Sequence, residues 1–309
     1  MHEAFVNICG ISTHIMTWGR WIEESLDDVK EIAVCITGNP GLPGFYTEFL
    51  GSLHERLEAK MPVWVIGHLG HDDPMETSIR LVPQLKGNEE FFNLNGQIKH
   101  KIEFINKYIP ANVKIHLIGH SIGAWMILQM LEHHEIKSRI KKCYMLFPTI
   151  ERMIDSPNGW LFTKIAMPLY PVFGFLITIF NKLPNVIKIL LVHIYFWFAS
   201  IPTHFIGTAL KYAKESVSEK VIFLAEDEMM CVRDLQRDII ESNLHLLKFF
   251  YGTTDGWVPV KYYKQIRESF PDIDAELDTK KIDHAFVLRY SNPMGVIVGD
   301  MITQNSDFL

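Results

Sequence analysis

Short apolar runs alternate along this chain with segments in which apolar residues recur every three or four positions. The short runs, bounded by turn residues, predict buried strands at 31–37, 62–68, 113–118, 142–148, 244–251 and 275–278. The recurring pattern predicts helices near 45–57, 98–109, 122–131, 261–270 and 294–301, and alternation over 5–16 predicts an opening hairpin. Strands that alternate with helices favour an α/β fold, with a mostly parallel sheet and helices on both faces.

This alternation stops at Thr149, where a long and unusually apolar segment begins. Two nearly continuous apolar stretches, 160–180 and 186–201, are separated by a short polar turn at 181–185. The sheet pattern resumes only near residue 244. We therefore assign residues 1–148 and 236–309 to an α/β core, and residues 149–235 to an apolar helical cap.

Each apolar stretch approaches the length of a membrane span, but charged residues and helix breakers interrupt both. The interruptions are Lys164, Pro168, Pro171 and Gly174 in the first stretch, and Lys188 and His193 in the second. A monotopic hairpin over about 160–201, seated in one leaflet, fits these interruptions better than two spans. The side chains expected to anchor it are Phe175, Leu176, Ile179, Leu190 and Phe196. The alternative is an apolar lid over an active site, and the two readings are compatible.

Composition narrows the class of protein. The 309 residues are 48% hydrophobic, so part of the apolar surplus is available to face something other than water. The net charge of −6 and the lack of a long basic run argue against a nucleic-acid partner. Four widely spaced cysteines without a CxxC motif predict buried thiols and no zinc site. The first residues lack the basic and apolar regions of a signal peptide, and residues 69–94 form a polar segment long enough to be a functional loop.

The strand at 113–118 leads directly into Gly119-His120-Ser121-Ile122-Gly123 and then into a helix. This is the G-x-S-x-G pattern in the strand–turn–helix context that a nucleophilic serine requires. The sharp turn crowds the positions two before and two after the serine, and glycine has no Cβ to clash there. Ser121 is therefore the candidate nucleophile, and the alternative is a simple tight turn.

The candidate acid is Asp255, because it follows a strand in a glycine-flanked turn and comes after Ser121 in the chain. The plain alternative is a turn aspartate that accepts hydrogen bonds from its own backbone. Asp227 and Glu228 lie in an acidic run of the cap, which makes them weaker candidates. Asp283 is adjacent to the candidate histidine, and adjacent side chains diverge.

The candidate base is His284, one of 14 histidines. It alone follows both Ser121 and Asp255 and lies in a loop after the last predicted strand. The order Ser, Asp, His is that of hydrolases with a nucleophile on such a turn. His120 flanks the serine, so its side chain is expected to turn away, whereas the loop residues His68 and His71 are placed to line the site.

An oxyanion needs two backbone donors. One is the amide of Ile122, at the first turn of the helix after Ser121. The other is expected in the loop after the 31–37 strand, where Pro40 has no N–H to donate. Asn39 is the first candidate and Leu42 the second. The alternative, a phosphate-binding loop, lacks GxGxxG and GKS/T motifs.

Four segments together resemble the lipid droplet-associated hydrolase family: Gly38-Asn39-Pro40-Gly41-Leu42, Gly119–Gly123, Asp255-Gly256-Trp257-Val258-Pro259 and Asp283-His284-Ala285-Phe286. The resemblance covers nearly the whole chain. It implies the α/β-hydrolase fold, residence on lipid droplets and the cytoplasmic face of the endoplasmic reticulum, and hydrolysis of sterol esters or other neutral lipid esters.

Two functions follow from these patterns. The first is a serine esterase that uses Ser121, His284 and Asp255 on a lipid ester and requires no metal or cofactor. The second is a lipid-droplet organising protein with weak or vestigial esterase activity. Neither function calls for an obligate protein partner. The sequence leaves the ester open among sterol esters, glycerides, retinyl esters and thioesters.

Overall fold

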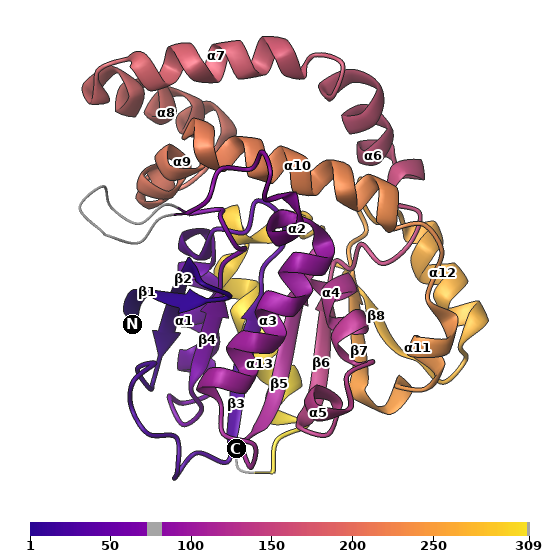
Figure 1. The fold of residues 1–309 in the computed structure, drawn as a ribbon. Coiled ribbons are helices and arrows are strands. Elements are labelled where there is room, and N and C mark those ends of the chain that lie inside the picture. Colours follow the sequence, from indigo (N-terminus) through magenta and orange to yellow (C-terminus); the bar gives the residue numbers. More distant parts are fainter. Residues whose placement is uncertain (73–81, 308–309) are drawn as a thin grey trace.

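The computed structural model describes residues 1–72 and 82–307 (Figure 1). Its centre is a mixed sheet of eight strands in the order β1-β2-β4-β3-β5-β6-β7-β8. The β1–β2 hairpin is antiparallel and β2 runs antiparallel to β4, while all other neighbours are parallel. The strands are β1 (His2–Ile8), β2 (Ile11–Trp18), β3 (Glu31–Ile36), β4 (Val63–Ile66), β5 (Lys114–His120), β6 (Ile140–Leu146), β7 (Leu247–Tyr251) and β8 (Asp274–Leu277). The predicted mostly parallel α/β sheet is confirmed.

Helices cover both faces of this sheet because the central strands are apolar on both sides. In β3, Ile32 and Val34 pack with one set of helices and Ala33 and Cys35 with the other. The first set contains α3 (Leu94–Tyr108), α4 (Ile122–Met130) and α12 (Val260–Ser269). The second contains α1 (Thr47–Arg56) and α13 (Ser291–Thr303). Two short helices, α2 (Glu89–Phe92) and α5 (His134–Lys137), lie in the connections.

The element ends differ from the sequence predictions by a few residues. The strand predicted from residue 244 begins at Leu247, because 244–246 form the turn η5 (Leu244–Leu246). The segment predicted as a polar loop over 69–94 contains α2, and its residues 73–81 lie outside the described residues. Like η5, the short elements η1 (Pro43–Tyr46), η2 (Met153–Asp155), η4 (Thr203–Phe205) and η6 (Phe286–Leu288) are single turns of 3₁₀ helix.

A helical insertion connects β6 to β7 and lies over one end of the sheet (Figure 1). It contains α6 (Pro157–Leu161), the π-helix η3 (Phe162–Ala166), α7 (Tyr170–Lys182), α8 (Asn185–Ala199), α9 (Ile206–Tyr212) and α10 (Glu215–Cys231). The helix α11 (Arg237–Glu241) follows it and lies beside the sheet near α12. In Figure 1, α10 crosses directly above the sheet, and α7 is the outermost helix. The insertion therefore lies between the sheet and whatever contacts this end of the molecule.

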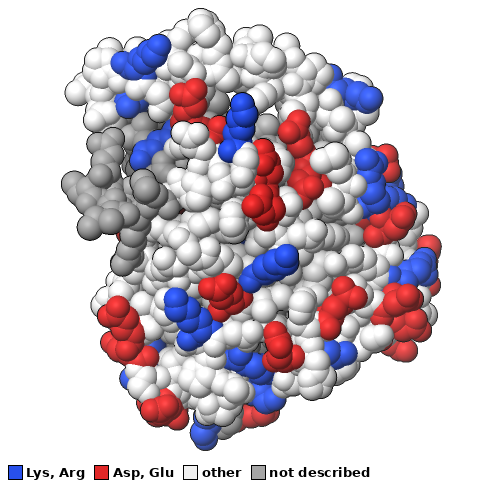
Figure 2. All heavy atoms as spheres, in the orientation of Figure 1, with Lys and Arg blue, Asp and Glu red and all other residues white. Residues whose placement is uncertain are grey.

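The outer helices of the insertion expose large apolar side chains. Phe175 is 65% exposed and Trp197 is 75% exposed, and Leu176, Ile179 and Leu190 are also exposed. Figure 2 shows the outermost part of this end as a largely uncharged surface that carries a few basic and acidic side chains. Apolar patches of this size on a protein surface mark contact with a membrane, a ligand or another protein.

The prediction that Phe196 is one of the anchoring side chains is wrong, because Phe196 is only 3% exposed. It points inward from α8 and lines a cavity at the sheet end of the insertion. Phe196 therefore cannot contact an external lipid surface. In α8 apolar residues occur on nearly every side of the helix, so the sequence pattern does not separate the inward face from the outward face. The prediction for Phe196 failed for this reason.

Among the described residues, no single helix is long and apolar enough to cross a membrane. One pair, Pro157–Ala166 with Tyr170–Lys182, passes the same test of length and composition together but is bent by 78°.

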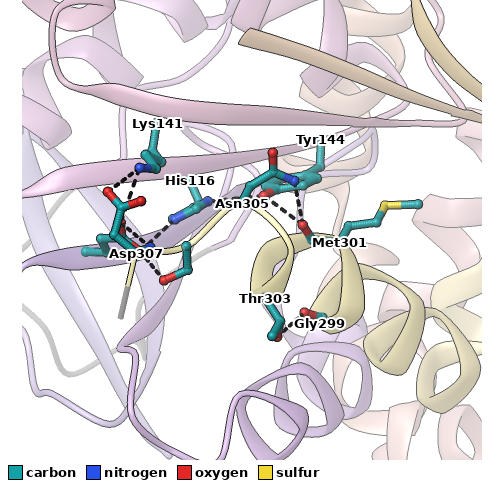
Figure 3. A network of polar contacts seen from close by, with 10 residues as sticks. His116, Lys141, Tyr144, Gly299, Met301, Thr303, Asn305 and Asp307 are labelled. Carbon is teal, nitrogen blue, oxygen red and sulfur yellow. Dashed lines mark hydrogen bonds and ion pairs between the residues drawn. The ribbon is translucent and has the colours of Figure 1, made fainter. Parts of the chain in front are cut away.

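The C-terminal segment after α13 is bound to the opposite end of the sheet (Figure 3). Glu31, at the start of β3, accepts hydrogen bonds from His116 Nε2 at 3.1 Å and from the Ser306 hydroxyl. Burial opposes ionisation of Glu31, but these bonds hold the pKa of its carboxyl below its ordinary value. Tyr144 in β6 adds a hydrogen bond from its hydroxyl to the Met301 carbonyl at 3.4 Å. These contacts fasten α13 to the core, far from the insertion.

Candidate active site

Ser121 sits on a strained turn between β5 and α4. Its backbone has φ 54° and ψ −121°, a conformation that non-glycine residues adopt rarely and at a cost of roughly 1–3 kcal/mol. The two flanking glycines make this turn possible. A Cβ on Gly119 would lie 2.9 Å from Ala124 Cα, and a Cβ on Gly123 would lie 2.4 Å from the Ile36 carbonyl oxygen. The turn therefore requires glycine at both positions, as the motif predicts.

Three sequence-predicted side chains meet at this turn. Ser121 Oγ is 2.9 Å from His284 Nε2, and His284 Nδ1 is 2.7 Å from Asp255 Oδ2. Asp255 follows β7 and His284 follows β8, so parallel strands bring residues from three distant segments to one edge of the sheet. Asp255 Oδ1 also accepts hydrogen bonds from the amides of Trp257 at 2.7 Å and Val258 at 3.0 Å.

These contacts keep Asp255 ionised. Burial opposes ionisation, but the neighbouring His284 and the two amides hold the pKa of the Asp255 carboxyl below its ordinary value. The alternative carboxylates are engaged elsewhere. Asp227 accepts from the Leu94 amide at 2.8 Å, and Asp283 is paired with Arg289 at 3.2 Å on the surface.

The two candidate oxyanion donors lie on either side of Ser121 in the fold. Asn39 follows β3 and lines the cavity at Ser121, whereas Leu42, the second candidate, does not line it. Ile122 is the first residue of α4, so its amide has no partner within the helix. Within the described residues, neither the Asn39 amide nor the Ile122 amide donates a hydrogen bond to the protein. Both amides therefore lack a hydrogen-bond acceptor in the protein; of the two residues, only Asn39 lines the cavity, and Ile122 directly follows Ser121 in the chain.

The Asn39 side chain is held by α10, in the insertion. Its Nδ2 donates to the Val221 carbonyl and to Glu228 Oε1, both at 3.0 Å. The acidic run in which Glu228 lies made it a weaker candidate for the acid, and that interpretation missed its position at the site. Glu228 follows Val217, Val221 and Leu224 along the buried face of α10, at the helical spacing of an apolar stripe. A carboxylate on such a stripe is the signal that would have singled it out.

Glu228 is fully buried in the wall of the cavity at Ser121. Burial is the largest influence on it and raises the pKa of its carboxyl to about 8, against the hydrogen bond from Asn39. The group is therefore mainly neutral at pH 7 and can both accept from Asn39 and donate a hydrogen bond.

His120 also has a position that its sequence neighbourhood did not reveal. It makes no hydrogen bond to Ser121, but it connects the surrounding loops. The Gly38 amide donates to the Tyr46 hydroxyl at 2.7 Å, and that hydroxyl lies 2.6 Å from His120 Nδ1. His120 Nε2 is 2.9 Å from the His284 carbonyl oxygen, to which it donates. Burial, with help from the nearby His284, lowers the pKa of His120 to about 3, so the ring stays neutral.

The other two histidines support the Asn39 loop from behind and do not line the cavity. His71 Nδ1 donates to the Pro40 carbonyl at 2.7 Å, and His68 lies 3.5 Å from the Thr37 hydroxyl. Burial lowers the pKa of His71 to about 3 and that of His68 well below its usual range. The expectation that they line the site is therefore wrong, because the loop folds between them and the cavity.

The cavity at Ser121 has a volume of about 420 Å³, in the range of small-molecule sites. Its floor carries the polar groups of Ser121, His284 and Asn39, and most of its walls are apolar side chains of the insertion. No cluster of three or more metal-ligating side chains occurs in residues 1–72 and 82–307. The arrangement brings together a serine hydroxyl, a histidine ring and an aspartate carboxylate, with two backbone amides that have no acceptor among the described residues.

We predict that Glu228→Gln makes the protein progressively more stable than the wild type as pH rises from about 4.5 to about 8. Below this window the carboxyl is neutral in both states; within it the unfolded chain ionises while the buried group does not, so folding is disfavoured. The substituted amide keeps an acceptor for Asn39 without a titrating proton. The measurement is thermal unfolding of both proteins at a series of pH values.

The matched control is Met230→Gln, at an exposed position of the same helix that carries no titratable group, which should show no such trend. A stability difference between the Glu228→Gln variant and the wild type that stays constant across this pH range would contradict the burial of a neutral carboxyl.

Comparison with known proteins places the chain. A family described as lipid-droplet associated hydrolase matches residues 29–287. The chain is 68% identical over 306 residues to "Lipid droplet-associated hydrolase" of Drosophila melanogaster, covering 99% of each chain. It is 33% identical to the protein of that name from Homo sapiens, covering 98% of this chain and 95% of the human one.

Solved structures agree on the fold. A bromoperoxidase from Bacillus anthracis matches 99% of this chain and 100% of its own, with a TM-score of 0.62 and 13% identity. An esterase from Exiguobacterium antarcticum matches 98% of this chain and 100% of its own, with a TM-score of 0.61 and 13% identity. At these identities the likeness establishes the α/β-hydrolase fold and no more. The family match over residues 29–287 and the identity to the relatives show that the chain belongs to the lipid-droplet associated hydrolase family.

Proposed function

We propose that this protein is a serine hydrolase that cleaves lipid esters at the surface of lipid droplets. The observation that supports this most directly is the continuous series of hydrogen bonds Ser121–His284–Asp255 at the floor of an apolar cavity. The insertion that roofs this cavity exposes apolar side chains outward, and the relatives carry lipid droplet-associated hydrolase as their name.

The proposed mechanism has two half-reactions. His284 Nε2 removes the proton from Ser121 as Oγ attacks the ester carbonyl carbon, and the amides of Asn39 and Ile122 hold the resulting oxyanion. Collapse of this intermediate breaks the bond to the alcohol, which leaves with the proton from His284. Water then attacks the acyl-enzyme with His284 as base. The bond between the acyl carbon and Ser121 Oγ breaks, Oγ takes the proton back from His284, and the carboxylic acid leaves. Asp255 orients the ring of His284 and stabilises its charged form.

The substrate we propose is a neutral lipid ester, such as a sterol ester. The mainly apolar walls of the cavity favour an uncharged, hydrocarbon-rich molecule, and an ester carbonyl would lie beside Ser121 and His284. The family name adds the lipid droplet as the place where such esters are stored.

A second candidate, an organising protein of the droplet surface, draws on a different observation. The exposed apolar side chains of α7 and α8 lie on the outside of the insertion and do not depend on the residues around Ser121. Their contribution to lipid attachment would persist if catalysis were lost. Activity measurements on the variants below distinguish the two.

The proposed location is the droplet surface and the cytoplasmic face of the endoplasmic reticulum. A hairpin seated in one leaflet need not emerge in water on the far side, and a droplet is bounded by a phospholipid monolayer around oil. The bend of 78° between the two segments of the only helix pair long and apolar enough to span, among the described residues, suits such a one-sided seat.

We predict that Ser121→Ala lowers kcat on p-nitrophenyl butyrate to background, a loss on the order of 10⁶, because the attacking oxygen is gone. Asp255→Asn should retain weak activity, since it mis-orients His284 without removing it; the equivalent change in a serine protease costs ~10⁴ in kcat. The measurement is steady-state kinetics on purified proteins with thermal unfolding as the folding check.

Each variant has a matched control. Ser242→Ala removes an exposed hydroxyl at the end of α11, and Asp283→Asn removes the carboxylate next to His284; both should retain wild-type kcat. Activity that survives Ser121→Ala, or that is lost in Asp283→Asn but kept in Asp255→Asn, would show the assignment to be wrong.

We further predict that glutamate at Phe175, Ile179 and Leu190 together releases the protein from droplets into the cytosol. Each of these exposed side chains yields roughly 1.5–3 kcal/mol when buried in hydrocarbon, and a carboxylate reverses that gain. None of them lines the cavity at Ser121, so hydrolysis of a small soluble ester should continue. The measurement is imaging of a fluorescent fusion in lipid-loaded cells.

Val296→Glu is the control, because it places the same charge on an exposed apolar site of α13, at the core. Continued accumulation of the triple variant around droplets would move the lipid-binding determinant elsewhere in the chain.

A further inference from the structure

The insertion contains a second cavity of about 600 Å³, farther from the sheet than the cavity at Ser121. We call it the outer cavity, and the one at Ser121 the inner cavity. The outer cavity is lined by residues of η3, α7, α8, α9 and α10 and is partly open to the outside, and no charged side chain among the described residues lines it. Its polar groups are limited to Ser218 and the hydroxyls of three tyrosines. It is therefore suited to hydrocarbon.

The two cavities share a wall. Six residues line both, and four of them are aromatic: Phe162, Tyr195, Phe196, Tyr212, Ala209 and Ile222. A single layer of side chains thus separates the cavities, without an intervening helix or strand. Exposed side chains change rotamer within picoseconds to nanoseconds. Tyr195 and Tyr212 are exposed and can move aside in this way around a ligand, whereas Phe196 is buried.

The outer cavity also meets the exposed apolar surface of the insertion. Phe173, Leu176, Leu191 and Tyr195 line it, although each is between 44% and 63% exposed. The same side chains therefore face both the cavity and the outside. A molecule leaving a lipid surface would pass from one apolar environment to another without crossing water.

The inner cavity is the more polar of the two, as expected if it holds the ester group while the outer cavity holds hydrocarbon. The inner cavity holds Ser121, His284, Asn39 and Glu228. The outer cavity holds none of these, and its walls match only the hydrocarbon part of a lipid. A carbonyl in the inner cavity and a chain in the outer one would place each part of the substrate in an environment of its own polarity.

We propose that the outer cavity binds the distal part of a long acyl chain whose carbonyl lies at Ser121, and that this chain enters from the lipid surface between the aromatic side chains of the shared wall. The assignment rests on the proposed hydrolase function. A flexible methylene chain passes a layer of side chains that a rigid ring system does not. The acyl chain, unlike the alcohol, also stays bound through both half-reactions.

A chain bound in this way makes the enzyme selective for acyl length. Each methylene moved from water into an apolar site raises affinity roughly fourfold, so a long chain gains from the outer cavity and an acetyl group does not. Blocking the shared wall should remove this gain while leaving the inner cavity open.

The test uses tryptophan at three alanines of the insertion. Ala209 lines both cavities, Ala166 lines only the outer one, and Ala199, at the end of α8, lines neither. The substrates are p-nitrophenyl esters from acetate to palmitate, in detergent micelles. We expect Ala209→Trp to lower the palmitate-to-acetate ratio of kcat/KM at least tenfold. Ala166→Trp should lower it too, but only for longer chains than Ala209→Trp affects, and Ala199→Trp should not.

Two further measurements keep the outcome clear. Labelling with a small fluorophosphonate reports whether each variant still folds around Ser121, and Ala209→Phe replaces Ala209→Trp if the larger side chain prevents folding. Binding of cis-parinaric acid, a linear fluorescent fatty acid, tests the outer cavity without catalysis, and both cavity variants should bind it at least tenfold more weakly.

Equal loss for short and long esters in Ala209→Trp, with unchanged binding of cis-parinaric acid, would overturn the proposal. If the wild type hydrolyses no ester, the proposed function fails. The outer cavity is then judged by the binding result alone: weaker binding in both cavity variants supports it, and unchanged binding overturns it.

Discussion

The strained backbone of Ser121 is the constraint on which the rest of the site depends. A positive φ at a serine persists only where the surrounding structure enforces it. Here Ser121 is the single residue between the end of β5 and the start of α4. Neighbouring atoms approach Gly119 and Gly123 so closely that a Cβ would not fit at either position. The loops after β3 and β8 are then connected to the same turn through Tyr46 and His120. Separate segments of the chain are thereby fixed around one oxygen atom.

The insertion serves this turn in two ways. Its inner helix, α10, contributes Glu228 and the Val221 carbonyl, which together hold the side chain of Asn39. Its outer helices, α7 and α8, expose apolar side chains on the outside of the molecule and line the outer cavity. The helix α10 therefore lies between the outer helices and the Asn39 loop and contacts both. The helices proposed to attach to lipid are therefore different from the helix that holds the Asn39 side chain, although all belong to the same insertion.

Chain order and local pattern were sufficient to predict the sheet, the turn at Ser121 and the approach of Asp255 and His284, because parallel strands deliver their carboxyl ends to one edge. What could not be predicted depends on which way a side chain faces. Phe196 was expected on the outside and lies inside; the apolar residues of its helix occur on nearly every side, so their pattern does not identify the inward face. Glu228 and His120 act through partners more than seventy residues away, and no local pattern encodes such a contact.

The proposed function makes Ser121 the nucleophile of a hydrolase that acts at the droplet surface. The most direct measurement is mass-spectrometric mapping of the adduct formed when protein bound to isolated droplets reacts with a fluorophosphonate. We predict a single modified peptide, with the phosphonyl group on Ser121, and no reaction after prior unfolding of the protein. No adduct, or an adduct on another serine while Ser121 stays unmodified, would contradict this role.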